Sequence, residues 1–414
     1  MGKTITEKIL ARAAGTKEVS PGDYIEVTSR CFFIPGSTRH VGLADKVFDP
    51  KRIAWVDGHT GSTASNQAAQ NRSSGLEWAK RVGIPMENIY ALGRQGIEHM
   101  VAADNAWARP GEVFFEGNNG HTTALGAFGA FAITLSYGSA AYMMTGKTWI
   151  RVPDSVKFIM KGTLPKGVYA RDVFEYVLGQ IGPSACPGMV MEWVGPLIDE
   201  MDMDARITLT DLALFTGAWT GIINPDQKTI DYVRTRTDEP FEPLVSDDEA
   251  RYAKVFEFDV SNLVPQIVPP PKRYIVKNVT ELEGTPINRG FVGSCANSRM
   301  ADLRLAAQVL RGKKLHPEVI LNITPGTVKI YQQAIHEGLV DIFIDAGCLI
   351  ASPNCGMCWA ANTPLAAADV CISTGTCNYP GRMGSKDAEI YLGNPALAAA
   401  SCIEGKIVDP RRFL

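Results

Sequence analysis

The chain has 414 residues, of which 45% are hydrophobic and 21% charged, proportions that are ordinary for a globular protein and exclude a disordered, collagen-like or coiled-coil chain. The 41 basic and 44 acidic residues give a formal net charge of −3, so the chain lacks the basic footprint expected of a protein that binds nucleic acid. A mean hydropathy of −0.02 argues against several membrane spans.

The N-terminal segment and the cysteine content indicate the cellular compartment in which the protein works. No apolar stretch of signal-peptide length follows residues 1–8, so secretion is not expected. Nine cysteines are too few for a disulfide scaffold in a chain of this length, and the number is odd. We therefore expect a cytoplasmic protein without a membrane segment, in which some thiols are kept for chemistry.

The first part of the chain alternates between helical and strand patterns. Apolar residues at helical spacing predict a helix within residues 1–20, with a turn at 20–23. A second helix is expected at 71–82, and apolar or alternating runs predict strands at 24–28, 53–57, 89–92 and 112–116. Such alternation is typical of an α/β architecture with parallel sheets, in which loops at the carboxyl ends of strands form the site. The loops 57–63 and 117–123 are therefore of interest.

One segment has the length of a membrane span but the wrong composition for one. Residues 125–144 contain no charge, yet they are rich in Gly, Ala, Ser and Thr and lack a dense run of Leu, Ile and Val. We expect a helix that is buried on all sides within a large folded protein.

A Pro-rich stretch at 264–273 is the best linker candidate, and it divides the chain into residues 1–273 and 274–414. Beyond it, the pattern predicts helices at 301–311 and 329–337, and strands at 291–295, 319–323 and 340–344. Residues 274–414 therefore read as an α/β domain of their own.

The strongest chemical feature is the pair Cys355 and Cys358, separated by two residues, together with Cys295 sixty residues earlier. Gly356 permits a tight loop, so that two thiolates can reach one metal centre from a single turn. Three thiolates suit a four-iron cluster with one iron not held by protein, and they also suit a zinc site or a redox pair. Inert buried thiols are a further alternative, and they are the default for the remaining six cysteines.

Several motifs resemble those of the aconitase superfamily, in particular the large subunits of isopropylmalate dehydratases. The segments Gly293–Arg299 and Cys355–Ala360 resemble the two cluster-cysteine motifs of that family. Further matching segments follow in the same order along nearly the whole chain: Asp45–Pro50, Gln95–His99, Arg109–Glu112, His121–Thr123, Gly126–Ala130, Met203–Arg206 and Gly381–Gly384.

The resemblance implies an aconitase-like fold of three α/β domains, with parallel or mixed sheets around a central cluster site and no fourth, swivelling domain. It assigns residues 1–273 to the first two domains and residues 274–414 to the third. It further implies a 4Fe–4S cluster held by Cys295, Cys355 and Cys358, whose fourth iron acts as a Lewis acid in a reversible dehydration. In relatives the swivelling domain carries a catalytic serine and is often a separate small subunit, so we expect such a partner.

The chain departs from the family at several positions of the substrate shell. Relatives carry Asp-His at the end of the first strand, where this chain has Asp57, Gly58 and His59. The family's Asp-Ser-His-Thr is replaced by a sequence that begins with Asn119 and Gly120. An Asn and a Glu on a later helix align with Asp211 and Phe215, and a usual Arg aligns with Cys377. The lost Arg removes a bidentate carboxylate anchor, so we expect a substrate with a different, less anionic group.

The expected function is a hydro-lyase acting on a small hydroxy di- or tricarboxylic acid similar to isopropylmalate. Alternatives are a different metal and reaction on the same fold, or a non-catalytic regulatory member. We expect catalytic roles for His99, His121, Asp57 and His59, and substrate binding by Arg382, Ser298, Arg299 and Asn119. Some of these residues have simpler interpretations: the histidines could satisfy loop backbone groups, Arg299 could form a structural ion pair, Arg382 could lie on the surface, and Asp211 could cap a helix N-terminus.

Overall fold

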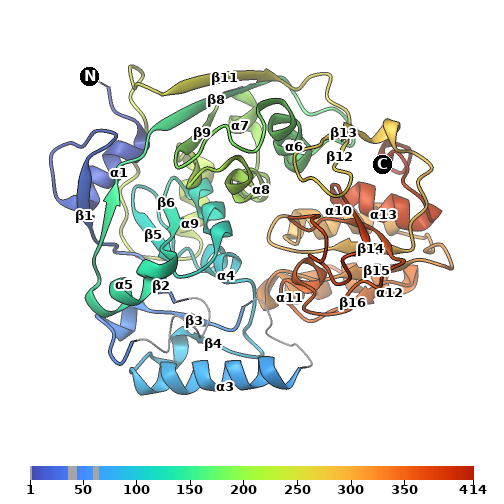
Figure 1. The fold of residues 1–414 in the computed structure, drawn as a ribbon, viewed down its shortest axis with the longest axis horizontal. Coiled ribbons are helices and arrows are strands. Elements are labelled where there is room, and N and C mark those ends of the chain that lie inside the picture. The colour runs from blue at the N-terminus through green and yellow to red at the C-terminus, as the bar shows by residue number, and fades with distance from the viewer. Residues whose placement is uncertain (1, 36–43, 59–64) are drawn as a thin grey trace.

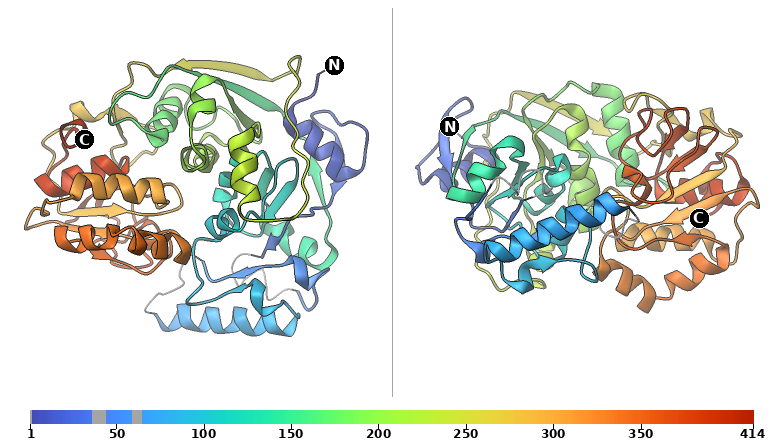
Figure 2. Two further views of the ribbon diagram at one scale, coloured as in Figure 1. Left: turned by 180° about the vertical axis from the view of Figure 1, so that it is seen from behind. Right: turned by 60° about the horizontal axis from the view of Figure 1, so that its bottom comes forward.

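The structure is a computed structural model, and it describes residues 2–35, 44–58 and 65–414. Two groups of elements lie side by side (Figure 1). The first, coloured blue to green, contains four small sheets; the second, coloured orange to red, is built on one larger sheet. The two views of Figure 2 show the same division. The alternating sequence pattern therefore predicted the α/β class correctly.

The first helix, α1 (Ile5–Ala14), is shorter than the sequence pattern allowed. Thr4 and Glu7 form a capping box at its start, and Gly15 ends it in the left-handed conformation with φ +67°. Strand β1 (Tyr24–Val27) follows, and it pairs antiparallel with β7 (Thr148–Arg151). This pair lies at the periphery of the first group.

The next elements form two small parallel sheets, one around the strand predicted at 112–116 and one from the two strands predicted at 53–57 and 89–92. Strands β2 (Phe33–Ile34), β5 (Val113–Glu116) and β6 (Phe131–Thr134) form a three-stranded sheet in the order β2-β5-β6. Strand β3 (Trp55–Val56) pairs parallel with β4 (Ile89–Tyr90). Helices α3 (Asn66–Arg81) and α4 (Glu98–Asp104) flank this pair in sequence. All of the predicted strands up to residue 116 are therefore present.

The prediction of one buried helix over residues 125–144 is wrong. The chain instead forms a 3₁₀ segment, η3 (Gly120–Phe128), then strand β6, a short 3₁₀ turn (Ser136–Gly138) and helix α5 (Ser139–Thr145). Gly129 breaks the first segment with φ +67°. A Cβ at Gly126 would lie 1.7 Å from the carbonyl oxygen of Gly221, so this glycine allows η3 to pack closely on β10. Residues 125–133 are buried, as expected for an uncharged stretch, but Tyr137 is 92% exposed, so the missing charges do not mark one buried helix.

A four-stranded parallel sheet forms the other half of the first group, in the order β10-β9-β8-β11. Its strands are β8 (Ser155–Lys161), β9 (Val190–Val194), β10 (Thr220–Ile223) and β11 (Lys254–Asp259). The associated helices are α6 (Ala170–Ile181), α7 (Pro196–Glu200), α8 (Met203–Asp211) and α9 (Gln227–Arg234). Phe158, Phe174 and Trp193 are fully buried in the core of this unit.

The Pro-rich segment 264–273 passes from this unit to the second group. It is partly built into both sides rather than free: the backbone N–H of Gln266 donates to Asp172, and Val268 exchanges hydrogen bonds with Leu392. Short strand β12 (Gln266–Ile267) pairs antiparallel with β13 (Lys277–Asn278).

The second group is a five-stranded parallel sheet in the order β16-β15-β14-β17-β18. The strands are β14 (Arg289–Val292), β15 (Ile320–Ile323), β16 (Leu349–Ile350), β17 (Val370–Ser373) and β18 (Glu389–Leu392). The helices are α10 (Met300–Leu310), α11 (Val328–His336), α12 (Leu339–Ala346) and α13 (Pro395–Glu404). The sequence predicted strands β14 and β15 and helices α10 and α11, but not β16, β17, β18 or α13.

The strand predicted at 340–344 is wrong, because this run is helix α12. Gly338 and Gly347 bound it, both in the left-handed conformation. Leu339, Phe343 and Ala346 are its buried residues, at spacings of four and three, which is the helical period. Ile344 is 59% exposed, so the β-branched residues that suggested a strand are not all in the core.

Candidate functional site

The candidate site lies where strands of both groups end. Asn119 and His121 follow β5, Cys295 follows β14, and Cys355 follows β16. His99 lies in the first turn of α4. Because the carboxyl ends of parallel strands share an edge, residues far apart in sequence meet there.

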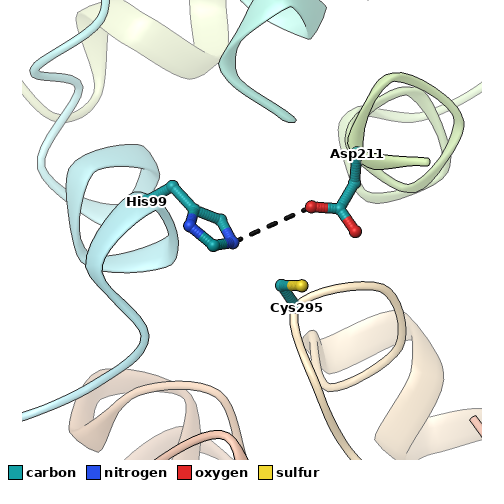
Figure 3. A group of neighbouring side chains, drawn as sticks. All are labelled: His99, Asp211 and Cys295. Atoms are coloured by element: carbon teal, nitrogen blue, oxygen red, sulfur yellow. Dashed lines mark ion pairs between the residues drawn. The ribbon is translucent and has the colours of Figure 1, made fainter. Parts of the chain in front are cut away.

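His99 is 1% exposed and is surrounded by polar groups. The side-chain amide nitrogen of Asn119 lies 3.2 Å from its Nδ1, within hydrogen-bonding distance. The carboxylate of Glu116 lies 3.9 Å from the same nitrogen. On the other side of the ring, Nε2 lies 3.8 Å from Oδ1 of Asp211 (Figure 3).

His121 pairs more closely with Asp211. Its Nδ1 lies 3.2 Å from the backbone oxygen and 3.3 Å from Oδ1 of Asp211. Burial opposes ionisation of Asp211, but the charge of His121 and its hydrogen bond, together with the charges of His99 and Arg299, outweigh burial and lower its pKa. The rings of His99 and His121 lie 6.2 Å apart, so one carboxylate serves two imidazoles.

Asp211 does not cap a helix N-terminus, so that interpretation is wrong. It is the last residue of α8, whose N-cap is Asp202. The position brings Asp211 to the histidines and also to Cys295. One ligand atom each of His99, Asp211 and Cys295 lies within 4.8 Å of the others, and all three residues are buried (Figure 3).

Glu116 is a site residue that the sequence reasoning missed. It is fully buried at the end of β5, where it accepts a hydrogen bond of 2.8 Å from the Thr122 hydroxyl. Its position in the sequence could have indicated a site residue, because Glu116 ends an apolar strand. A carboxylate at such a position is either buried, and then needs polar partners, or lies at the edge of the sheet. Glu116 brings a second carboxylate to the side of His99 that Asn119 contacts.

The three predicted cluster cysteines are all buried, at 5, 6 and 4% exposure for Cys295, Cys355 and Cys358. Burial raises the pKa of Cys295 well above its usual value, and the charges of Asp211, Cys358 and Cys355 act in the same direction. The effect of Cys355 and Cys358 on Cys295 places the loop after β14 near the loop after β16. None of the nine cysteines, all of which are described, forms a disulfide.

Cys358 has surroundings that favour a thiolate. Burial opposes its ionisation, but the charge of Arg382 and hydrogen bonds from the backbone and side chain of Thr376 outweigh burial and lower the pKa of the thiol. Arg382 Nη2 donates to Cys358 Sγ at 3.4 Å, and the guanidinium lies 4.7 Å from the ring centre of Trp359. Three buried thiols from two loops, one of them with a lowered pKa, fit the donor set of a cluster with one open iron.

Ser298 and Arg299 lie next to this space but are engaged by the protein. The Ser298 hydroxyl is fully buried and donates to the Ser294 carbonyl at 2.6 Å. Arg299 is 4% exposed and precedes α10, where its backbone N–H donates to Asp302. Its guanidinium donates to Thr208 at 3.3 Å. These contacts support a role in shaping the cysteine loop.

Asp57 follows β3, as the sequence predicted, and is 7% exposed. Burial raises its pKa to about 6; Arg72, at 3.8 Å, opposes this rise, and Glu98 adds to it. Glu98 lies against the backbone of Gly58, where a Cβ would come within 2.1 Å of its carboxyl carbon. The prediction for His59 falls outside the residues that the structure describes.

A buried ion network beside the cysteine loops was also missed. Glu175, on α6, is contacted by Arg171 at 3.3 Å and by both terminal nitrogens of Arg273. Arg273 also lies 4.6 Å above the ring of Phe215, which in turn contacts His121. A hydrophobic helix face with Arg and Glu four residues apart is the sequence signal that could have found the pair.

The comparisons with known proteins agree with this geometry. Residues 53–273 and 271–405 match the aconitase family (aconitate hydratase), and the chain belongs to that family. It is 40% identical over 424 residues to the 3-isopropylmalate dehydratase large subunit of Aquifex aeolicus, covering 99% of this chain and 97% of that protein. It is 38% identical over 423 residues to large subunit 1 of Methanopyrus kandleri, with both chains fully covered. The relatives are dehydratases, and the chain is an enzyme of the hydro-lyase class.

The fold is also similar to a solved structure. Aconitase X from Thermococcus kodakaraensis, in its holo-form, superposes with a TM-score of 0.51 at 14% identity, covering 85% of this chain and 84% of that one. At this identity the likeness establishes the shared fold only. Among the described residues, the helices are all too short or too polar to cross a membrane.

Proposed function

We propose that the chain is the large subunit of an iron–sulfur hydro-lyase that dehydrates, and can isomerise, a small hydroxy di- or tricarboxylic acid similar to isopropylmalate. The observation that carries the proposal is the proximity of three buried thiols to His99, His121 and two carboxylates, in loops that follow strands of two separate sheets. The large-subunit names of the relatives support a separate small subunit as partner, and their metabolic reaction supports a cytoplasmic location.

Cys295, Cys355 and Cys358 would hold a 4Fe–4S cluster, and residues 274–414 would form the domain that carries it. When bound, such a cluster supplies a Lewis-acidic iron that polarises a substrate hydroxyl. Arg382 supports this assignment, since its hydrogen bond and charge favour the thiolate form of Cys358. Residues 1–273 would supply the histidines from the first two domains.

The chain's own residues provide proton transfer and substrate orientation. His121 is a candidate for proton transfer, because the buried carboxylate of Asp211 lies 3.3 Å from its Nδ1 and orients the ring. Arg382 is the cation best placed to bind a substrate carboxylate, since it is only partly buried and lies beside the cysteines. Asp57, whose pKa is about 6, is a second candidate for proton transfer.

The first experiment measures iron, sulfide and zinc, with the visible absorption spectrum, on anaerobically purified protein. About four irons per chain are expected, and they should be lost in Cys355→Ser but retained in Cys348→Ser, which changes a partly buried cysteine outside the two cluster-cysteine motifs. Zinc, or no metal under strictly anaerobic conditions, would refute the cluster assignment.

The second experiment tests the reaction and the partner together. The iron-loaded chain is assayed with isopropylmalate and related hydroxy acids, with and without a small subunit. We expect turnover only when both subunits are present. Arg382→Lys should raise KM strongly, because lysine cannot form the paired hydrogen bonds of a guanidinium with a carboxylate. Equal activity without the small subunit would contradict the proposed division of the site.

A further inference from the structure

The orientation of the Asn119 amide is fixed by its role as a helix cap. Asn119 is the N-cap of η3, and its Oδ1 accepts a hydrogen bond of 3.0 Å from the backbone N–H of His121. A backbone N–H can only donate, so the atom it contacts must be the amide oxygen. The amide nitrogen of Asn119 therefore faces Nδ1 of His99, at 3.2 Å.

This contact determines which nitrogen of His99 carries the proton. An amide NH₂ is a donor only, so Nδ1 of His99 must accept and cannot carry a proton toward it. The nearest Glu116 oxygen, at 3.9 Å, is beyond hydrogen-bonding distance from Nδ1 and already accepts from Thr122. The proton of a neutral His99 is then on Nε2, the nitrogen that faces Asp211 at 3.8 Å.

His121 has the opposite surroundings. Its Nδ1 faces two acceptors of Asp211, the backbone oxygen at 3.2 Å and the carboxylate Oδ1 at 3.3 Å. Neither can donate, so Nδ1 of His121 carries a proton, and Nε2 is left as the nitrogen that can gain or lose one. Asp211 stabilises the ring when both nitrogens are protonated.

We propose that Asn119 and Asp211 are positioning residues that hold the two histidines in opposite tautomers. In this arrangement His121 takes up and returns the proton, while His99 acts only as a hydrogen-bond donor from Nε2. The catalytic part of the proposal rests on the proposed dehydration. There, doubly protonated His121 gives its Nε2 proton to the departing hydroxide as the carbon–oxygen bond breaks, so that water leaves and His121 remains neutral with its proton on Nδ1. The proton on the neighbouring carbon goes to the catalytic serine expected on the small subunit, and the electron pair of that carbon–hydrogen bond forms the double bond.

Relative to the family motifs, the acidic and amide side chains at positions 119 and 211 are exchanged. In the motif resemblance described under Sequence analysis, Asn119 takes the place of the family's aspartate, and Asp211 takes the place of an asparagine. Asparagine and aspartate are both good N-cap residues, so either of them can cap η3 at position 119. The group that faces Nδ1 of His99 is a hydrogen-bond acceptor if it comes from aspartate and a donor if it comes from asparagine. A proton on Nε2 of His99 also leaves that nitrogen no lone pair, which argues against a single metal ion bound between His99, Asp211 and Cys295.

The tautomers are read directly by nitrogen NMR of the full-length, iron-free chain labelled with ¹⁵N-histidine at neutral pH, with His99 and His121 assigned from H99Q and H121Q. His316 is an internal reference, because its Nδ1 accepts a hydrogen bond from the backbone N–H of Glu318. We expect His99 to resemble His316, with its proton on Nε2, and His121 to be protonated on Nδ1. Asn119→Asp should move the His99 proton to Nδ1, whereas Asn71→Asp, at an exposed site on α3, should change neither ring.

The holoenzyme gives a second, independent test. Glutamine can donate from a position near Nε2, so His99→Gln should keep kcat within about tenfold of wild type, while His99→Leu should not. His121→Gln should lower kcat by about 10²–10⁴-fold, the usual contribution of a general acid or base. A His99 proton on Nδ1, or equal losses in His99→Gln and His121→Gln, would overturn the proposal. An inactive wild type would refute the proposed function and leave the NMR test of the tautomers intact.

Discussion

The buried ion network next to the cysteine loops permits a quantitative prediction. Arg171 is 1% exposed and lies 3.3 Å from the fully buried carboxylate of Glu175. Its guanidinium also donates to Asn297 Oδ1 at 2.9 Å and to the carbonyls of Thr374 and Gly375 at 2.6 and 2.7 Å. Arg171 therefore ties α6 of the first group to the loops that follow β14 and β17 in the second.

Replacing Arg171 by Met keeps most of the volume but removes the charge. The Asn297 and Gly375 oxygens lose this donor, while the Thr374 carbonyl keeps a hydrogen bond of 3.3 Å from the Ser294 hydroxyl. Within the described part of the chain, Glu175 still pairs with Arg273, whose side chain is 12% exposed. Removing one partner of a buried ion pair costs about 3–5 kcal/mol, because the remaining charge is left incompletely compensated. We expect a loss of this size in the free energy of unfolding, measured by urea denaturation with circular dichroism.

A surface pair provides the matched control. Lys161 and Glu257 form an ion pair of 2.6 Å whose side chains are 48% and 55% exposed. Lys161→Met should cost less than about 1 kcal/mol, since solvent screens exposed pairs. If Arg171→Met also lies within about 1 kcal/mol of wild type, charge burial does not hold the two groups of elements together, and the reasoning is refuted.

Two further predictions concern pH and packing. Burial raises the pKa of Asp172 to about 6 in the folded protein, from 3.8 in the unfolded chain. The folded state therefore favours the protonated carboxyl, and the stability that this contributes is fully present below pH 3.8 and is lost as the pH rises through about 6. Between pH 5 and 7.5, wild type should lose about 1 kcal/mol relative to Asp172→Asn in urea titrations; parallel curves would contradict this. Gly126→Ala should destabilise the chain by about 3 kcal/mol or more in thermal unfolding, because its Cβ would meet the Gly221 carbonyl at 1.7 Å. Gly312→Ala, in open space at φ +70°, should cost only about 1–2 kcal/mol, and a loss no larger for Gly126→Ala would contradict the collision argument.

Sequence patterns predicted the structure correctly where the residues of a short segment determine its conformation. Strands that end in polar loops, the Cys355 and Cys358 spacing, and His121 after β5 could all be recognised from the sequence. Segment 125–144 and helix α12 could not, because apolar and β-branched residues fit a buried strand and a buried helix equally well. In α12 the glycines at 338 and 347 decided the outcome by bounding one short helix.

The composition and motifs of the sequence by themselves determined the α/β class, the family and the loops that carry the cysteines and histidines. Only the tertiary structure decided which carboxylates serve which histidine. Asp211 lies ninety residues from His121 in sequence, yet its carboxylate is 3.3 Å from the ring nitrogen because α8 ends against η3. Proton positions on His99 and His121 depend on donors and acceptors within about 3 Å, and no spacing along the chain encodes a distance between separate elements.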